Sequence, residues 1–137
     1  MFTSLKNRAA RSALAFSSTA LFCGIFSAVY EHFSHGVYSP FMVWLFLFPL
    51  LGGALPYLCI FAAGARLPGA LPRDMWDSGV ATLTVGSALT GVFEIYGTTA
   101  PLVGIYWFAG AALMLTGAVT YCAGSFAKRR AEGERAR

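Results

Sequence analysis

One glutamate and both histidines of the chain fall within a stretch of five residues, in the segment VYEHFSHGVYS at residues 29–39. Glu31, His32 and His35 belong to the residue types that carry protons or bind metal ions. A second glutamate, Glu94, lies near the end of a later apolar stretch and completes a hypothetical Zn or Cu site with His32 and His35. No nucleophile–base arrangement and no phosphate-binding loop accompanies these residues, so we predict that the protein is not an enzyme.

The composition of the chain indicates the surroundings of these residues. Of its 137 residues, 57% are hydrophobic and 12% are charged, and the mean hydropathy is +0.62. Soluble domains are about one quarter charged, so these values indicate a single integral membrane domain over residues 1–137. The cysteines lie inside apolar segments without CxxC or Cys–His spacing, and we expect structural thiols rather than a disulfide or zinc framework: Cys23, Cys59 and Cys122.

Four apolar stretches are long enough to cross a bilayer, because about 20 residues of α-helix span the hydrocarbon core. These stretches are residues 12–30, 41–63, 80–96 and 102–126. We therefore predict an all-α membrane protein, a four-transmembrane-helix bundle built from two tandem helical hairpins. Asp77 or Ser78 is expected to cap the third span. The first span is expected to remain in place, because no signal-peptidase site follows it.

The distribution of charge predicts the direction of the spans. All ten basic residues lie in the tail 1–11, the loop 64–79 or the tail 127–137, whereas residues 31–40 and 97–101 contain none. Under the positive-inside rule both termini and the middle loop are cytoplasmic, and the two loops without basic residues face outside. We expect a multi-pass protein of the cytoplasmic membrane, with basic tails that contact anionic lipid headgroups and no nucleic acid.

A short internal repeat relates the two halves of the chain. An offset of 63 residues aligns VYEHF at 29–33 with VFEIY at 92–96, and so pairs the two glutamates. At an offset of 64 residues, GALPY at 53–57 matches GAVTY at 117–121. We infer two parallel hairpins related by a pseudo-twofold axis along the membrane normal.

Small residues line the helix faces that carry the two glutamates. Gly24 lies on the face of Glu31, and Ser87 and Gly91 lie on the face of Glu94. Small residues let membrane helices approach closely, so we expect spans one and three to meet and to bring the glutamates together near the outer end. The last span carries a glycine stripe that predicts another close contact: Gly110, Gly117 and Gly124.

No lysine or arginine lies on the predicted outer side to neutralise Glu31 and Glu94. A protonated histidine, a shared proton, a metal ion or a cationic ligand has to take that role. His35 lies one helical turn beyond Glu31, and we expect Gly36 and Gly97 to end their helices. The alternative is that the glutamates and histidines are ordinary residues of the membrane boundary, within a belt of aromatic side chains.

Two prolines interrupt the second span, which reads FPLLGGALPY at residues 48–57. Each proline removes a backbone hydrogen bond and leaves the carbonyl of Leu45 or Gly52 without its usual donor. Transporters use broken helices of this kind to bind ions and to move. The alternative is a static kink whose carbonyls are satisfied by neighbouring helices. The hypothetical hinge comprises Pro49, Gly52, Gly53 and Pro56.

Four runs of the sequence, YEHFSHGVYSPFM, PLLGGALPY, SGVATLTVGS and EIYGTT, resemble those of an uncharacterised family of small four-span integral membrane proteins of bacteria. The resemblance covers most of residues 12–110. It implies an integral bacterial membrane protein, and it carries over no catalytic roles because no activity is established for that family.

These observations together favour a small transporter, or a membrane subunit of one, that binds a proton, a metal ion or a small cation near the outer face. A second hypothesis is a non-catalytic structural subunit whose glycine-rich helices pack against a larger membrane partner. A third is a redox subunit that holds haem or copper. The expected partners are the lipid bilayer and a second copy of the chain or a larger membrane complex, and no particular cofactor is predicted.

The redox hypothesis is tested by an absorption spectrum and metal analysis of the purified protein. Axial haem ligation requires His or Met on facing helices, whereas both histidines lie at the outer end of one predicted span. We therefore expect no Soret band and no stoichiometric copper. A Soret band, or one equivalent of copper, would favour the redox subunit over the transporter.

Overall fold

The computed structural model describes residues 2–64 and 67–135, and every regular element in these ranges is helical. In chain order, the elements are α1 (Phe2–Phe33), α2 (Pro40–Val43), the π-helix η1 (Phe48–Ala54), α3 (Leu55–Ala63), α4 (Ala70–Ile95), the 3-10 helix η2 (Pro101–Val103) and α5 (Gly104–Arg135). We refer to α2, η1 and α3 together as the second span.

The four predicted membrane spans are confirmed as helical segments of sufficient length and hydropathy: Asn7–Phe33, Pro40–Ala63, Ala70–Ile95 and Pro101–Ala127. The third helix, α4, starts at Ala70 rather than at residue 80, and its N-cap is Gly69. Asp77 and Ser78 therefore lie inside α4, and the prediction that one of them caps this helix is wrong. The charged residues of this segment suggested a loop, but a helix tolerates them where its first turns leave the hydrocarbon.

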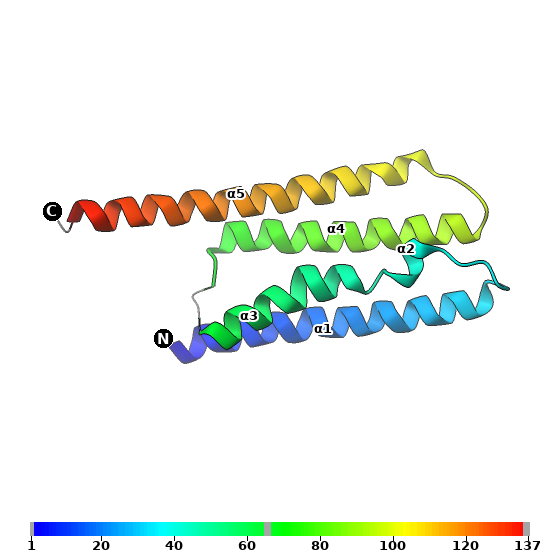
Figure 1. The fold of residues 1–137 in the computed structure, drawn as a ribbon, viewed down its shortest axis with the longest axis horizontal. Coiled ribbons are helices and arrows are strands. Elements are labelled where there is room, and N and C mark those ends of the chain that lie inside the picture. Colours follow the sequence, from blue (N-terminus) through cyan, green and yellow to red (C-terminus); the bar gives the residue numbers. More distant parts are fainter. Residues whose placement is uncertain (1, 65–66, 136–137) are drawn as a thin grey trace.

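The four spans lie side by side in one layer, with the second span between α1 and α4 and with α5 at the far edge (Figure 1). The second span contacts α1 through all three of its elements and contacts α4 through α2 and η1. The backbone of α5 lies next to that of α4 and of no other span, and the side chain of Trp107 in α5 also contacts Phe41 and Phe48 of the second span. Within the described residues no Cα atom of α1 lies within 8 Å of one in α4. The prediction that spans one and three pack directly on each other is therefore wrong.

The small-residue faces of α1 and α4 receive the second span instead. A Cβ atom placed on Gly24 of α1 would lie 4.0 Å from Cβ of Phe46. A Cβ atom placed on Gly91 of α4 would lie 3.0 Å from the backbone nitrogen of Met42, and Ser87 is fully buried. The small residues thus indicate close approach correctly, but they do not specify which helix approaches.

The second span is interrupted just before the predicted hinge. The α-helix stops after Val43, and residues 44–46 form a turn before the chain resumes helical structure and enters η1. Pro49 has no N–H group, and its ring crowds the carbonyl of Leu45. The proline therefore disrupts the helical turn that precedes it, which places the interruption upstream of Pro49.

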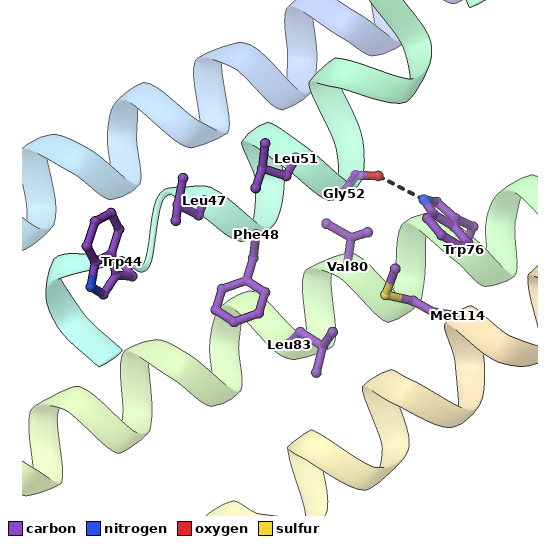
Figure 2. Close-up of a pocket in the computed structure, with 9 residues that line it drawn as sticks. All are labelled: Trp44, Leu47, Phe48, Leu51, Gly52, Trp76, Val80, Leu83 and Met114. Carbon is purple, nitrogen blue, oxygen red and sulfur yellow. Dashed lines mark hydrogen bonds between the residues drawn. The ribbon is translucent and has the colours of Figure 1, made fainter. Parts of the chain in front are cut away.

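The remainder of the predicted hinge is tightly packed. Pro56 cannot donate to the carbonyl of Gly52, and Nε1 of Trp76 in α4 donates to this oxygen at 2.8 Å (Figure 2). A Cβ atom placed on Gly53 would overlap the ring of Phe16 in α1. At Gly52 the alternative of a kink satisfied by a neighbouring helix is confirmed, while a hinge function stays a prediction.

Two of the three glycines in the predicted stripe of α5 make a close contact with α4. A Cβ atom on Gly110 would lie 2.7 Å from Cγ of Leu83, and one on Gly117 would lie 2.9 Å from the carbonyl oxygen of Pro72. Nothing lies within 4 Å of the corresponding position on Gly124, so the third contact is absent. The reason is that α4 begins at Ala70, and α5 extends past this end of it.

We predict opposite effects for the alanine substitutions Gly117→Ala and Gly124→Ala. In Gly117→Ala the added methyl group meets backbone atoms of Pro72 and Trp76, so α4 and α5 have to separate, at a cost of about 1–3 kcal/mol. Gly124→Ala adds the same group in open space and gains up to ~1 kcal/mol of helix propensity. Thermal unfolding of the detergent-solubilised protein, followed by circular dichroism, checks this. Equal midpoints for both variants would contradict the α4–α5 packing.

Candidate functional site

Two buried serines hold the short helix α2 between α1 and α4. Oγ of Ser27 in α1 donates to the carbonyl of Met42 at 2.7 Å, and Oγ of Ser87 in α4 donates to the carbonyl of Phe41 at 2.8 Å. A helix of one turn leaves carbonyl groups without intrahelical donors, and such groups are costly inside a bilayer. One serine from each flanking helix therefore stabilises the interruption of the second span.

The two glutamates lie on the same helix faces as these serines. Glu31 follows Ser27 by four residues and Glu94 follows Ser87 by seven, which places each glutamate above its serine on the helix surface. Both faces are turned toward the second span. Oγ of Ser39, the fully buried residue just before α2, donates to Oε2 of Glu94 at 2.5 Å. Glu94 therefore reaches the start of α2 from the side of α4, and Glu31 lies on the face of α1 that meets the second span, although α1 and α4 are not neighbours.

Glu31 carries an unsatisfied buried oxygen. Its Oε1 atom is inaccessible to solvent and has no hydrogen-bond partner among the described residues. Nearby, Oγ of Ser34 lies 2.7 Å from the backbone carbonyl oxygens of both Glu31 and Val37, to which its single proton is available, and it makes no bond to the carboxylate. A buried carboxylate oxygen without a donor costs free energy, and a proton or a cation would remove that cost.

The histidines are not part of this arrangement. His32 is exposed and its ring lies edge-on to that of Phe33, with 5.4 Å between the centroids. α1 ends at Phe33, and His35 follows it in a left-handed conformation with a φ of 56°. The expected pairing of Glu31 and His35 along one helix therefore does not form. Gly36 also has a positive φ, but it belongs to the turn beyond the helix end.

The hypothetical Zn or Cu site is not assembled. In the ranges that the structure describes, no group of three or more His, Cys, Asp or Glu side chains is placed to hold a metal ion. The proposed ligands His32, His35 and Glu94 are thus not brought together. The H-x-x-H spacing is unproductive because the helix ends between the two histidines, so they do not share a helix face.

The end of α4 is shaped as the sequence predicts. Gly97 has a φ of 69°, its N–H donates to the carbonyl of Glu94, and the N–H of Thr98 donates to the carbonyl of Phe93. This pair of bonds is the Schellman motif. It turns the chain beside Glu94 and places Thr98 and Thr99 at the rim of a cavity of about 460 Å³ that Glu94 also lines. Sequence reasoning missed these threonines, although their proximity to Glu94 in EIYGTT was a signal.

A second polar link lies nearer the opposite end of the layer. The hydroxyl of Tyr57 in α3 donates to the carboxylate of Asp77 in α4, at 2.8 Å to one oxygen and 2.9 Å to the other. The ring of Phe16 stacks on Tyr57 with 5.8 Å between the centroids. This link joins α1, the second span and α4, and sequence reasoning had assigned Asp77 to a helix cap.

Between the two ends, an apolar groove of about 520 Å³ follows the interrupted part of the second span (Figure 2). Val80 and Leu83 of α4 and Met114 of α5 line its far wall, and Trp44 and Trp76 lie at opposite ends of it. No polar side chain other than the indole groups lines this groove, so the chemistry of the molecule is at the two ends.

Comparison with known proteins assigns no family to this arrangement. No family profile, no curated protein and no solved structure matches the chain significantly.

We predict that Ser87→Ala destabilises the protein by about 1–3 kcal/mol, because the buried carbonyl of Phe41 loses its donor. The matched control is Thr82→Ala, since the hydroxyl of Thr82 is exposed and donates to Ser78 of its own helix. Thermal unfolding in detergent should lower the midpoint of Ser87→Ala clearly and leave that of Thr82→Ala within the range of surface substitutions. A Ser87→Ala variant as stable as Thr82→Ala would contradict the role of Ser87 at the interruption.

Proposed function

We propose that this chain is a small transporter of the cytoplasmic membrane, or the membrane subunit of one, that binds a proton or a small cation at Glu31 and Glu94. The observation that carries the proposal is the buried, unpartnered Oε1 atom of Glu31, on the helix face that meets the interrupted second span. Glu94 meets the same segment from the other side through Ser39. Ionisable groups inside membrane spans are costly, and function is the usual reason for their presence.

The arrangement of charge supports a ligand from outside the protein. In the proposed topology of two tandem hairpins with cytoplasmic termini, the outer loops contain no lysine or arginine. His32 and His35 are exposed and hold neither glutamate. The counter-charge for the two carboxylates therefore comes from a bound proton or cation. A transition-metal ion is no longer proposed, because the nitrogen ligands that Zn and Cu favour are not placed beside the carboxylates.

The interrupted second span offers a way to couple binding to movement. Ser39 is next to α2, and α2 is attached to α1 and α4 by one serine bond each. A proton or cation on Glu94 changes the strength of its hydrogen bond from Ser39, since a bond to a charged acceptor is stronger than one to a neutral acceptor. We propose that this difference shifts α2 relative to α1 and α4, with the turn at residues 44–46 and the Pro49–Pro56 segment absorbing the change.

A specific observation keeps the structural subunit as the second candidate. The backbone of α5 lies next to α4 alone among the spans, and large apolar side chains of α5 are exposed along its length: Phe108, Leu115 and Val119. A larger membrane partner would fit this surface. Gly110 and Gly117 do not supply it, because their close contacts are with α4 of the same chain.

The transport proposal predicts loss of ion flux in Glu94→Gln and in Glu31→Gln. Proteoliposomes that contain the unaltered protein should take up protons or Na⁺ when a membrane potential is imposed. The rate of uptake should be at least about tenfold lower with each variant. Each carboxylate is a proposed ligand of the ion, so the loss of either one removes part of its counter-charge and weakens its binding. Proton uptake is followed with an internal pH-sensitive dye and Na⁺ uptake with a tracer.

The matched control is Glu134→Gln, which removes a glutamate from the exposed end of α5, beyond the spanning segment. It should transport at the rate of the unaltered protein. A Glu94→Gln variant with full flux would overturn the transport proposal. The same result, together with loss of a co-purifying partner in Phe108→Ala, would favour the structural subunit.

A further inference from the structure

The cavity beside Glu94 has features that the proposed proton or cation site does not use. It lies between the end of α4, the loop at residues 98–100 and the start of the last span, and its volume is about 460 Å³. Binding sites for small molecules are typically about 300–1,000 Å³, so the cavity is larger than a proton or a bare ion needs. Its walls combine one carboxylate, hydroxyl groups and aromatic rings.

The carboxylate and the hydroxyl groups of the cavity have unused hydrogen-bonding capacity. Ser39 occupies Oε2 of Glu94, and Oε1 accepts no hydrogen bond from the described residues. The hydroxyls of Thr98 and Thr99 make no hydrogen bond within the same part of the chain. The cavity wall includes no lysine, arginine or histidine. Its charge is therefore negative, and it offers acceptors to a ligand that carries a positive charge.

The cavity wall also includes an aromatic ring, that of Trp107, which is held in place by its neighbours. The indole of Trp107 lies against the rings of Phe41 and Phe48, at centroid distances of 5.6 and 5.7 Å and interplanar angles of 62° and 65°. Its Nε1 atom donates to the hydroxyl of Thr90 at 3.4 Å. These contacts fix the indole in the wall of the cavity that Glu94 also lines, and they connect this wall with the second span.

From this combination we propose that the cavity binds a small organic ammonium ion. The carboxylate of Glu94 provides the counter-charge, and the ring of Trp107 provides the aromatic surface on which alkylated ammonium groups are stabilised. Thr98 and Thr99 meet a polar substituent of the ligand. This inference rests on the proposed function, because it uses the same glutamate, and it deepens that proposal by naming the class of ligand.

The two side chains that would bind such an ion are also in contact with the second span. Glu94 is bonded to Ser39 next to α2, and Trp107 contacts Phe41 of α2 and Phe48 of η1. A ligand between Glu94 and Trp107 thus touches two side chains that are each attached to the interrupted segment. Occupancy of the cavity is in this way linked to the position of α2.

Equilibrium binding of radiolabelled choline and ethanolamine to the purified full-length protein in nanodiscs tests the proposal. The neutral competitor is 3,3-dimethylbutan-1-ol, which has the shape of choline and no charge. We expect saturable binding of at least one ammonium probe and no competition by the alcohol. We expect Glu94→Gln to weaken binding at least about tenfold and Trp107→Leu to weaken it several-fold. Glu134→Gln should bind like the unaltered protein.

Comparable competition by the alcohol would overturn the proposal, because the site would then recognise shape alone. Unchanged binding in Glu94→Gln, or no saturable binding of either probe, would also overturn it. The comparison of choline with the alcohol uses the unaltered protein, so it stands even where a variant fails to fold. Glutamate-dependent ion flux without ammonium binding would refute this inference and leave the proposed function intact. Ammonium binding without any ion flux would support this inference and refute the proposed transport function.

Discussion

Inside the hydrocarbon of a bilayer, a backbone carbonyl that has lost its helical donor finds no water to replace it. Most of this fold follows from that constraint acting on the second span. The carbonyls of Phe41 and Gly52 each accept a hydrogen bond from a side chain of a neighbouring helix, and the carbonyl of Met42 accepts one from Ser27 in addition to the N–H of Leu45. The donors, Ser27, Ser87 and Trp76, come from α1 and α4. A broken helix that needs donors on both flanks has to lie between two intact ones, and this sets the order of the spans in the layer.

The position of the carboxylates is a result of the same bonds. Ser27 and Ser87 turn one face of α1 and one face of α4 toward the second span, and the regular spacing of a helix places Glu31 and Glu94 farther along these same faces. Both faces meet the second span, although α1 and α4 do not contact each other. Ser39 bonds only to Glu94, so the two glutamates that the predicted repeat would pair have different surroundings: Glu94 is hydrogen-bonded, and Oε1 of Glu31 is not.

Sequence reasoning identified the features that depend on local chemistry and missed those that depend on partner choice. Length and hydropathy identified the spans, and Gly97 ends α4 because a left-handed residue is needed there. Small residues such as Gly91 indicated that another helix approaches closely, but the sequence of one helix does not identify which helix packs against it. The pairing of Glu31 with His35 failed because the end of α1 is determined by the Ser34 turn, whose hydrogen bonds a spacing rule does not include. Donors such as Trp76 to a broken helix come from distant parts of the chain, and they are visible only in the fold.

Because the spans form a single layer, one copy of the chain does not surround an aqueous path. Four helices in a row enclose no lumen, and α1 and α5 are at opposite edges without contact in the part of the chain that the structure describes (Figure 1). In the proposed transporter, one copy of the chain would therefore line only one side of an aqueous path across the membrane. The proposal then requires a second copy of the chain, or a different membrane protein, to line the other side.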